Sequence, residues 1–220
     1  MLNSDTRLVL TNAIYFKGSW LNEFDSKDTV DGQFRVTPTE TVPVRMMSRT
    51  APAAFFARDG VKVVRLPYRG DTESMLLVVP DDVAGLAAVV GKMTSELVAK
   101  WRAGLHTGEV ALGLPKFKAT GKSRLGEALK RMGMPLAFDA GKADFSGMTD
   151  RERLSIAAVV HEAVVEVDEQ GTVAAAATAV AMAGDGARRV IEIRADRPFL
   201  FLIVDDATQA ILFAGRVAKP

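Results

Sequence analysis

The chain has 220 residues, of which 48% are hydrophobic and 25% charged, and it carries a formal net charge of +1. This composition is ordinary for a globular protein, and so small a net charge argues against nucleic acid or an anionic membrane surface as a partner. The absence of cysteine excludes a disulfide framework. The first residues lack a cationic segment followed by an apolar one, so we expect no signal peptide, and no apolar run is long enough to span a membrane.

Strand patterns dominate the first third of the sequence. Runs rich in β-branched and aromatic residues, bounded by turn residues, predict strands at residues 7–16, 41–47, 54–57, 61–67 and 74–80. The last run is almost continuously apolar, which is typical of a strand buried on both faces. The polar residues 22–31 predict a connection.

Helical spacing begins at residue 83. Gly91 divides residues 83–103 into two short helices, and Thr94 or Ser95 is predicted to cap the second. A further amphipathic helix is predicted to follow Ser123 as its N-cap and to end at Gly133. Its apolar face would comprise Leu125, Leu129 and Met132.

The remaining sequence returns to strand character. Strands are predicted at residues 109–117, 154–168, 190–193, 199–204 and 210–213. The last two form a hairpin through Asp205 and Asp206. No internal repeat is present, and no linker is wide enough to divide two domains. We therefore expect one β-dominated α+β domain over residues 1–220.

The residues needed for familiar catalytic chemistry are absent. His161 and Glu162 begin like a zinc-protease motif, but Val165 stands where the second histidine is required. Lys116 stands where a phosphate-binding loop requires glycine. A G-x-S-x-G nucleophile turn and a metal-ligand cluster are also missing. The sequence therefore predicts a protein that is not an enzyme and has neither a cofactor nor a metal site.

Residues 170–184 follow a predicted strand and contain no charge. Alanine, the strongest helix former, is frequent here, but a surface helix usually carries charges on its exposed face. As a strand, the segment would place small or apolar side chains on both faces, and Gly171 supplies a flexible joint at its start. The residues themselves leave three interpretations open: a helix, a linker, or a strand that can insert into a sheet.

Several motifs in the right order resemble the serpin family. Residues 169–178, EQGTVAAAAT, resemble the hinge signature of the serpin reactive loop. Others resemble the third strand of the main sheet with its following tryptophan, internal family motifs and the closing hairpin: LTNAIYFKGSW at 10–20, LPY at 66–68, LPKF at 114–117, DFSG at 144–147, RPFLF at 197–201 and ILFAGRVAKP at 211–220. The resemblance spans essentially the whole chain and corresponds to the C-terminal portion of a longer domain. The first strands of the main sheet and the helices before the third strand are missing.

The resemblance implies mixed sheets with few helices and a mobile or insertable reactive loop at about residues 170–190. In serpins a serine protease attacks this loop and is trapped when the cleaved loop inserts into the main sheet as a strand. The chain would therefore inhibit a serine protease as a suicide substrate, as a monomer, outside the cell or in the periplasm. The hinge residues implied are Glu169, Gly171, Thr172, Ala174, Ala176 and Thr178.

The resemblance also implies a bait bond and a gate in the sheet. Counting from Glu169 places the reactive bond at Asp185–Gly186, and counting back from Pro198 allows a window over residues 184–187. An Asp at the cleaved position would favour a protease with a basic specificity pocket. The alternatives are a trypsin-like enzyme acting at Arg188 or Arg189, and an elastase- or subtilisin-like enzyme acting at Met182 or Ala183.

Three further residues resemble those that control opening of the main sheet. Asn12 and His161 resemble a hydrogen-bonded pair on the two strands between which the loop inserts, although His161 could equally be a satisfied core histidine. Trp20 resembles the residue at the top of the opening, although burial in a core is the usual fate of tryptophan. The second function that stays open is a non-inhibitory or inactive truncated serpin-fold protein with a binding or structural role.

Overall fold

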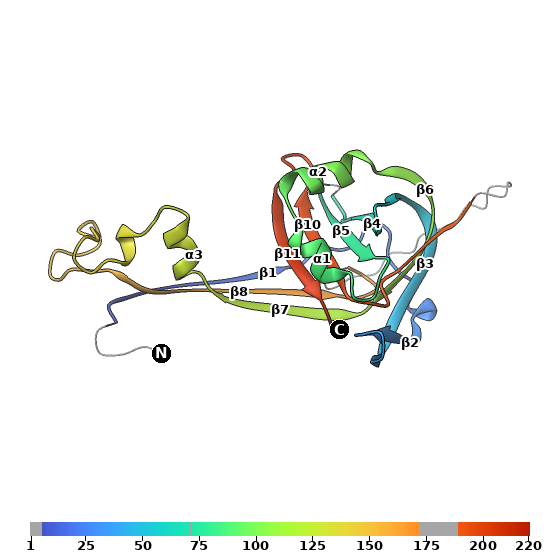
Figure 1. Ribbon diagram of the computed structural model, residues 1–220, viewed down its shortest axis with the longest axis horizontal. Helices are drawn as coiled ribbons and strands as arrows, with labels where there is room; N and C mark the ends of the chain where they lie inside the picture. Colours follow the sequence, from blue (N-terminus) through green and yellow to red (C-terminus); the bar gives the residue numbers. More distant parts are fainter. Residues whose placement is uncertain (1–5, 71, 172–188) are drawn as a thin grey trace. The chain divides into compact units, whose positions relative to one another are not determined.

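The structure is a computed structural model that describes residues 6–70, 72–171 and 189–220. The chain divides into two compact units, one comprising Met1–Tyr15 and Thr120–Val164 and the other Phe16–Ala119 and Val165–Pro220 (Figure 1). Three strands, β1 (Leu8–Phe16), β7 (Phe117–Arg124) and β8 (Ile156–Val167), continue from one unit into the other. A single domain over residues 1–220 therefore stays a prediction.

The larger unit contains an eight-stranded sheet. Seven of its strands follow the order β11-β10-β5-β4-β3-β6-β9, and β2 pairs with β3. The pairing of β6 with β9 is parallel and the others are antiparallel. The bounds are β2 Val30–Arg35, β3 Thr41–Arg58, β4 Val61–Pro67, β5 Glu73–Pro80, β6 His106–Pro115, β9 Ile191–Arg194, β10 Phe199–Asp205 and β11 Ile211–Val217.

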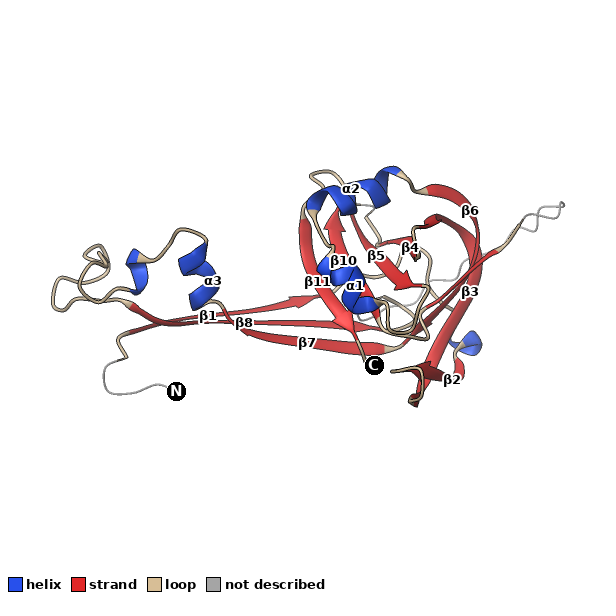
Figure 2. Ribbon diagram, in the orientation of Figure 1, coloured by secondary structure: helices blue, strands red, loops and turns tan. Residues whose placement is uncertain are grey.

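The central strands of this sheet are buried on both faces. Side chains alternate along a strand, so Met75 and Leu77 of β5 join one apolar cluster while Leu76 and Val78 join another. Helices α1 (Leu86–Gly91) and α2 (Ser95–Ala103) cover the second cluster (Figure 2). The continuous apolar run predicted to be doubly buried is therefore confirmed.

The smaller unit is built around a three-stranded sheet in the order β1-β8-β7. Most of β1 is exposed, including Leu10, Ile14 and Tyr15. The helices α3 (Gly126–Arg131) and η2 (Leu136–Phe138), the second a 3-10 helix, lie between β7 and β8 in the sequence. This sheet is therefore held by backbone pairing with little apolar burial along β1.

Two segments were predicted as strands or as a connection with the wrong extent. Residues 41–47 and 54–57 belong to one strand, β3, because pairing with β6 from Met46↔Pro115 to Phe55↔His106 keeps the polar residues between them extended. Residues 22–31 are not only a connection: they contain the 3-10 helix η1 (Ser26–Asp28) and the start of β2. Hydrogen bonding to a distant strand explains the full length of β3 and the start of β2.

The predicted cap of the third helix was also wrong. Ser123 lies in β7, where pairing with β8 keeps polar residues extended, and α3 begins at Gly126 without a side-chain cap. Met132 lies beyond the helix and is 82% exposed, so the predicted apolar face is not buried. The predicted end is confirmed, because Gly133 has a φ of +102°, which favours glycine.

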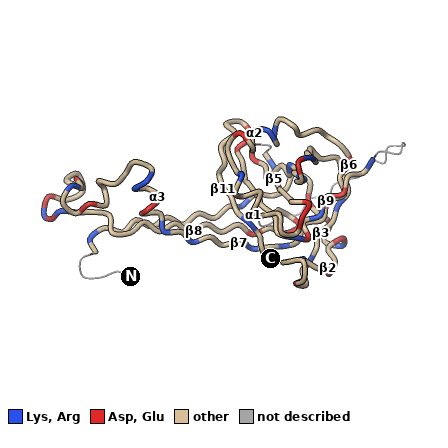
Figure 3. Tube along the Cα trace, viewed as in Figure 1, with Lys and Arg blue, Asp and Glu red and all other residues tan. Residues whose placement is uncertain are grey.

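Basic and acidic residues are interspersed along the chain, as expected from its small net charge (Figure 3). In the part of the chain that the structure describes, the helices are too short or too polar to cross a bilayer.

Candidate functional site

Residues Asp168–Gly171, here the hinge turn, follow β8 directly. The N–H of Asp168 donates to the carbonyl of Gly171 at 2.9 Å, and the N–H of Gly171 donates back to the carbonyl of Asp168 at 3.3 Å. Gly171 has a φ of +134°, and a Cβ there would lie 2.3 Å from the carbonyl oxygen of Gly18. Glycine is therefore required both by the backbone conformation and by the approach of the neighbouring chain.

Residues Ser19–Phe24, here the receiving segment, bind the hinge turn through their backbone. Ser19 forms an isolated antiparallel bridge with Gly171. The N–H of Trp20 donates to the carbonyl of Gln170 at 3.0 Å, and the N–H of Phe24 donates to the carbonyl of Glu169 at 2.9 Å. The hinge turn is thus held on the segment that follows β1.

Trp20 is buried against the hinge turn. It is 1% exposed, and its ring stacks on Tyr68 with the centroids 4.6 Å apart. Its indole Nε1 donates to the carbonyl of Asp168 at 3.1 Å. Trp20 is therefore a core residue that also contacts the hinge turn. Its predicted role in controlling the opening of the sheet stays a prediction.

Glu169 is the acidic residue of the hinge turn, and its carboxylate is fully engaged. Oε1 accepts from the hydroxyl of Thr29 at 2.9 Å, and Oε2 accepts from Nζ of Lys116 at 2.7 Å. Partial burial raises the pKa of Glu169, but hydrogen bonds from Lys116, the backbone and Thr29 outweigh it, so the pKa lies below its usual value. The hinge turn is therefore anchored by a charged pair as well as by its backbone.

The predicted gate residues Asn12 and His161 are brought together in the smaller unit. Asn12 lies on β1 and His161 on the neighbouring strand β8, and Nδ1 of His161 lies 2.9 Å from Oδ1 of Asn12. The distance fits a hydrogen bond donated by the imidazole to the amide oxygen. Asn12 is exposed and His161 half-buried, so the pair bridges two strands outside the core.

The other predicted site residues lie outside the described residues. These are Thr172, Ala174, Ala176 and Thr178 of the hinge, and Asp185 and Gly186 of the bait bond, together with its alternatives at residues 182–184, 187 and 188.

The hinge role of Glu169 and Gly171 stays a prediction, and the residues that contact them were not identified from the sequence. Lys116, Thr29 and Tyr68 received no predicted role, although Lys116 and Tyr68 lie inside the motifs LPKF and LPY. Those motifs could have marked both residues as part of the site, whereas no signal marked Thr29.

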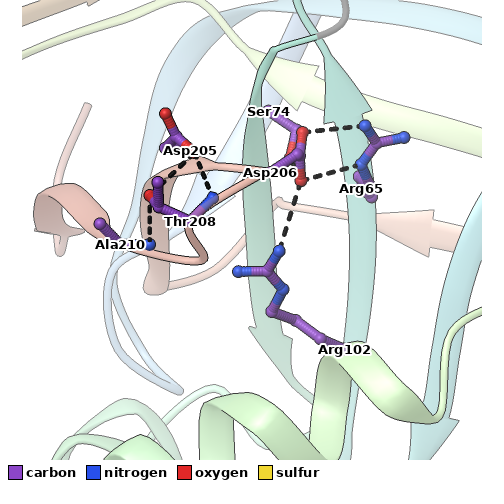
Figure 4. Close-up of polar contacts among 7 residues, drawn as sticks. All are labelled: Arg65, Ser74, Arg102, Asp205, Asp206, Thr208 and Ala210. Atoms are coloured by element: carbon purple, nitrogen blue, oxygen red, sulfur yellow. Dashed lines mark hydrogen bonds and ion pairs between the residues drawn. The ribbon is translucent and has the colours of Figure 1, made fainter.

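A second polar cluster surrounds Asp206, which sequence reasoning placed only in a turn (Figure 4). Its carboxylate accepts from the hydroxyl of Ser74 on β5 at 3.0 Å and from Nη2 of Arg65 on β4 at 2.9 Å. Arg102 of α2 completes the cluster at 3.6 Å. Asp205, beside it, caps the same turn by accepting from the N–H of Thr208. The cluster therefore ties the β10–β11 turn to the sheet and to α2.

A family model described as serpin (serine protease inhibitor) matches residues 1–220. Serpin B6 of Pongo abelii is 40% identical over 98% of this chain and 58% of its own length. A serine protease inhibitor of Cyanea capillata is 37% identical over 100% of this chain and 59% of its own length. The chain therefore belongs to the serpin family, and it spans less than three fifths of the length of these relatives.

Solved structures agree with this assignment. Human thyroxine-binding globulin, solved with its hormone, superposes with a TM-score of 0.88 at 33% identity, covering 100% of this chain and 58% of that protein. Uncleaved ovalbumin superposes with a TM-score of 0.85 at 35% identity, covering 100% and 56%. The predicted β-dominated α+β fold with mixed sheets and few helices is confirmed. The expected extracellular location receives no support from the relatives.

Proposed function

We propose that this chain inhibits a serine protease by acting as its suicide substrate. The protease serine would attack the carbonyl carbon of Asp185, the peptide bond to Gly186 would break, and residue 185 would stay joined to the serine as an ester. Insertion of the released segment into the sheet of β1 and β8 would then trap this ester before water hydrolyses it. The chain would act as a monomer, with neither nucleic acid nor a membrane as partner.

The position of the hinge turn carries this proposal. β1 and β8 are direct neighbours in their sheet, and the chain leaves the end of β8 through Gly171, which is bridged to Ser19 just after β1. Thr172 would therefore be the first residue to enter between the two strands. Because Thr172, Ala174, Ala176 and Thr178 are small and uncharged, each could be buried there at low cost.

The energy available from insertion supports the same function. Each new ladder hydrogen bond contributes roughly 1 kcal/mol net, so a dozen residues would release on the order of 10 kcal/mol or more with apolar burial added. The bond between Asn12 and His161 joins the strands that would have to separate. Losing it adds only about 1 kcal/mol to the cost of separating these two strands.

A covalent complex is the direct test of this proposal. We expect incubation with a panel of serine proteases to give a complex that survives denaturing electrophoresis with at least one of them. A member with a basic specificity pocket is expected first, because Asp185 would occupy that pocket. Cleavage of the chain without any such complex would sink the inhibitor proposal.

The variant Thr172→Arg tests the insertion step. A large charged side chain cannot be buried early in the sheet, so we expect cleavage to continue while the covalent complex is lost. Thr107→Arg, at an exposed position of β6, is the matched control and should leave complex formation unchanged. Retention of the complex by Thr172→Arg would count against insertion.

The second candidate is a non-inhibitory serpin-fold protein with a binding or structural role. Its support is that the chain spans only 58% and 59% of its relatives, since trapping a protease needs a body to hold it against. Similarity to thyroxine-binding globulin and ovalbumin also favours it. Cleavage without a complex across the whole protease panel is the result that this candidate predicts.

A further inference from the structure

Arg49 is a half-buried cation near the middle of β3. Its register partner Leu112 and the next residue across, Ile193, are both core residues, so the arginine side chain lies on the core side of the sheet. Burial lowers the pKa of Arg49 to about 10, and no aspartate or glutamate forms an ion pair with it in the described part of the chain. A cation taken from water without a counter-ion reduces stability. The contacts that Arg49 makes must therefore offset this loss of stability.

Among the described residues, the hydrogen bond and the aromatic contact of the Arg49 side chain both fall on the receiving segment. Nη1 donates to the carbonyl oxygen of Asn22. The guanidinium carbon lies 4.8 Å from the centre of the Phe24 ring, within the range of a cation–π interaction. Phe24 itself is 4% exposed, so the ring side of this contact is buried. Arg49 thus contacts the receiving segment at two neighbouring residues, through the backbone carbonyl of Asn22 and the ring of Phe24.

The same stretch of backbone holds the hinge turn through its N–H groups. Trp20 and Phe24, on either side of Asn22, donate to the carbonyls of Gln170 and Glu169 at 3.0 and 2.9 Å. The carbonyl of Asn22, between them, accepts from Arg49. A shift of this backbone would lengthen the hydrogen bonds to the hinge turn, so the two sets of contacts are mechanically linked.

We propose that Arg49 is a positioning residue for the hinge: it fixes the receiving segment so that Trp20 and Phe24 hold Gln170 and Glu169 in place. The proposal deepens the inhibitory function proposed above and rests on it where it concerns protease trapping. Through the hinge turn, Arg49 would set the direction in which Thr172 enters the sheet. Arginine suits this task because one planar group can donate to a carbonyl and stack on an aromatic ring together.

Amide hydrogen exchange tests this role without any protease. In Arg49→Met, which keeps an unbranched side chain without its charge, exchange at the N–H groups of Trp20 and Phe24 should become faster on the order of tenfold, since hydrogen bonds from charged donors are the stronger ones. Arg49→Lys keeps the charge and should restore part of the protection. Arg58→Met, at an exposed arginine of the same strand, is the matched control.

Two results would overturn the positioning role. One is exchange at Trp20 and Phe24 in Arg49→Met that stays within about twofold of the Arg58→Met control. The other is an equal increase at the amides of β5 and β10, because a general loss of stability affects the whole core. Should Arg49→Met fail to fold, Arg49→Lys is compared with Arg58→Lys, and a local increase at the same two amides is expected.

The functional consequence is measured separately. If the unaltered chain forms a covalent complex, Arg49→Met should raise the ratio of cleaved chain to complex several-fold, while the rate of loop cleavage stays the same. An unchanged ratio would overturn the role of Arg49 in trapping. If the unaltered chain forms no complex with any protease, the proposed function fails, and the exchange rates at Trp20 and Phe24 still decide whether Arg49 positions the hinge.

Discussion

Different interactions stabilise the eight-stranded sheet and the three-stranded sheet. In the eight-stranded sheet, β5 and β10 are buried along almost their whole length and contribute to apolar clusters on both faces. In the three-stranded sheet, β1 leaves Leu10 and Ile14 each 42% exposed and Tyr15 52% exposed. Apolar burial is the largest favourable contribution to folding, so most of the stability belongs to the first sheet. β1 relies mainly on backbone pairing, which makes it the strand that can part from its neighbour at lower cost.

Truncating one leucine in each sheet should give the largest contrast. Leu77→Ala leaves a cavity in a fully buried position of β5, so we expect a loss of about 2–5 kcal/mol of unfolding free energy. Leu10→Ala, on the exposed strand β1, should change it by less than about 0.5 kcal/mol. Urea unfolding followed by tryptophan fluorescence measures both. Losses of equal size would contradict the contrast between the sheets.

The Asp206 cluster extends the comparison to polar groups. Asp206→Asn removes the charge that Arg102 pairs with, and in the described part of the chain Arg102 has no other ion pair. We expect a loss of about 2 kcal/mol, below the usual cost of breaking a buried pair because the three charged side chains keep 16–28% exposure.

The control for this change is an exposed pair in the same sheet. Asp31→Asn breaks the contact between Asp31, whose side chain is 88% exposed, and Arg45, whose side chain is 55% exposed. This change should reduce the free energy of unfolding by no more than about 0.5 kcal/mol. Both variants are compared by urea unfolding. An equal cost would mean that burial does not strengthen the Asp206 cluster.

Removing the gate hydrogen bond should have a smaller, local effect. His161→Ala deletes the bond to Asn12, so hydrogen exchange along β1 should become faster by an amount equivalent to about 1 kcal/mol, while β5 is unchanged. His106→Ala, at the other histidine of the chain and on an exposed position of β6, should leave β1 unchanged. Faster exchange in both sheets would show that the strands do not open independently.

Acid should weaken the anchoring of the hinge by a small amount. The pKa of Glu169 is lower in the folded state than in the unfolded state. The ionised carboxylate therefore adds to the free energy of unfolding above the unfolded-state pKa, and this stabilisation is lost as the pH falls through the folded-state pKa. Glu169→Gln should therefore reduce unfolding free energy at neutral pH and have less effect in acid. Glu192→Gln, on an exposed residue of β9, provides the control. A difference that grew on acidification would contradict this sign.

Local sequence patterns predicted the elements that local forces decide. The apolar runs of β5 and β10 were predicted correctly. Of the two predicted caps of α2, Thr94 and Ser95, the structure shows Thr94, whose hydroxyl accepts from the N–H of Leu97 at 3.2 Å. The uninterrupted course of β3 and the polar end of β7 were missed. In these segments, pairing with β6 and with β8 overrides the secondary-structure preference of the residues. The local sequence does not show which distant strand a residue will pair with.

In the candidate site, too, the neighbouring residues of the hinge turn were predicted, and the distant residues that bind Glu169 were missed. The hinge turn could be proposed because the residues of the family signature lie next to one another in the sequence. Lys116 and Thr29, which bind Glu169, are 53 and 140 residues away from it. Arg49 was missed for a further reason: an arginine in a strand is usually solvated, and only the folded structure shows that its guanidinium lies over the ring of Phe24.

Gly171 has a consequence for anyone who would engineer this hinge. Two independent restrictions meet at one atom position, because the backbone angle disfavours every L-residue and the space for a Cβ is occupied by Gly18 and Ser19. Relieving one restriction leaves the other. A library that randomises residues 169–171 and selects for folded chains should therefore return many residues at position 170 and a single letter at position 171, where no combination of neighbouring changes can compensate.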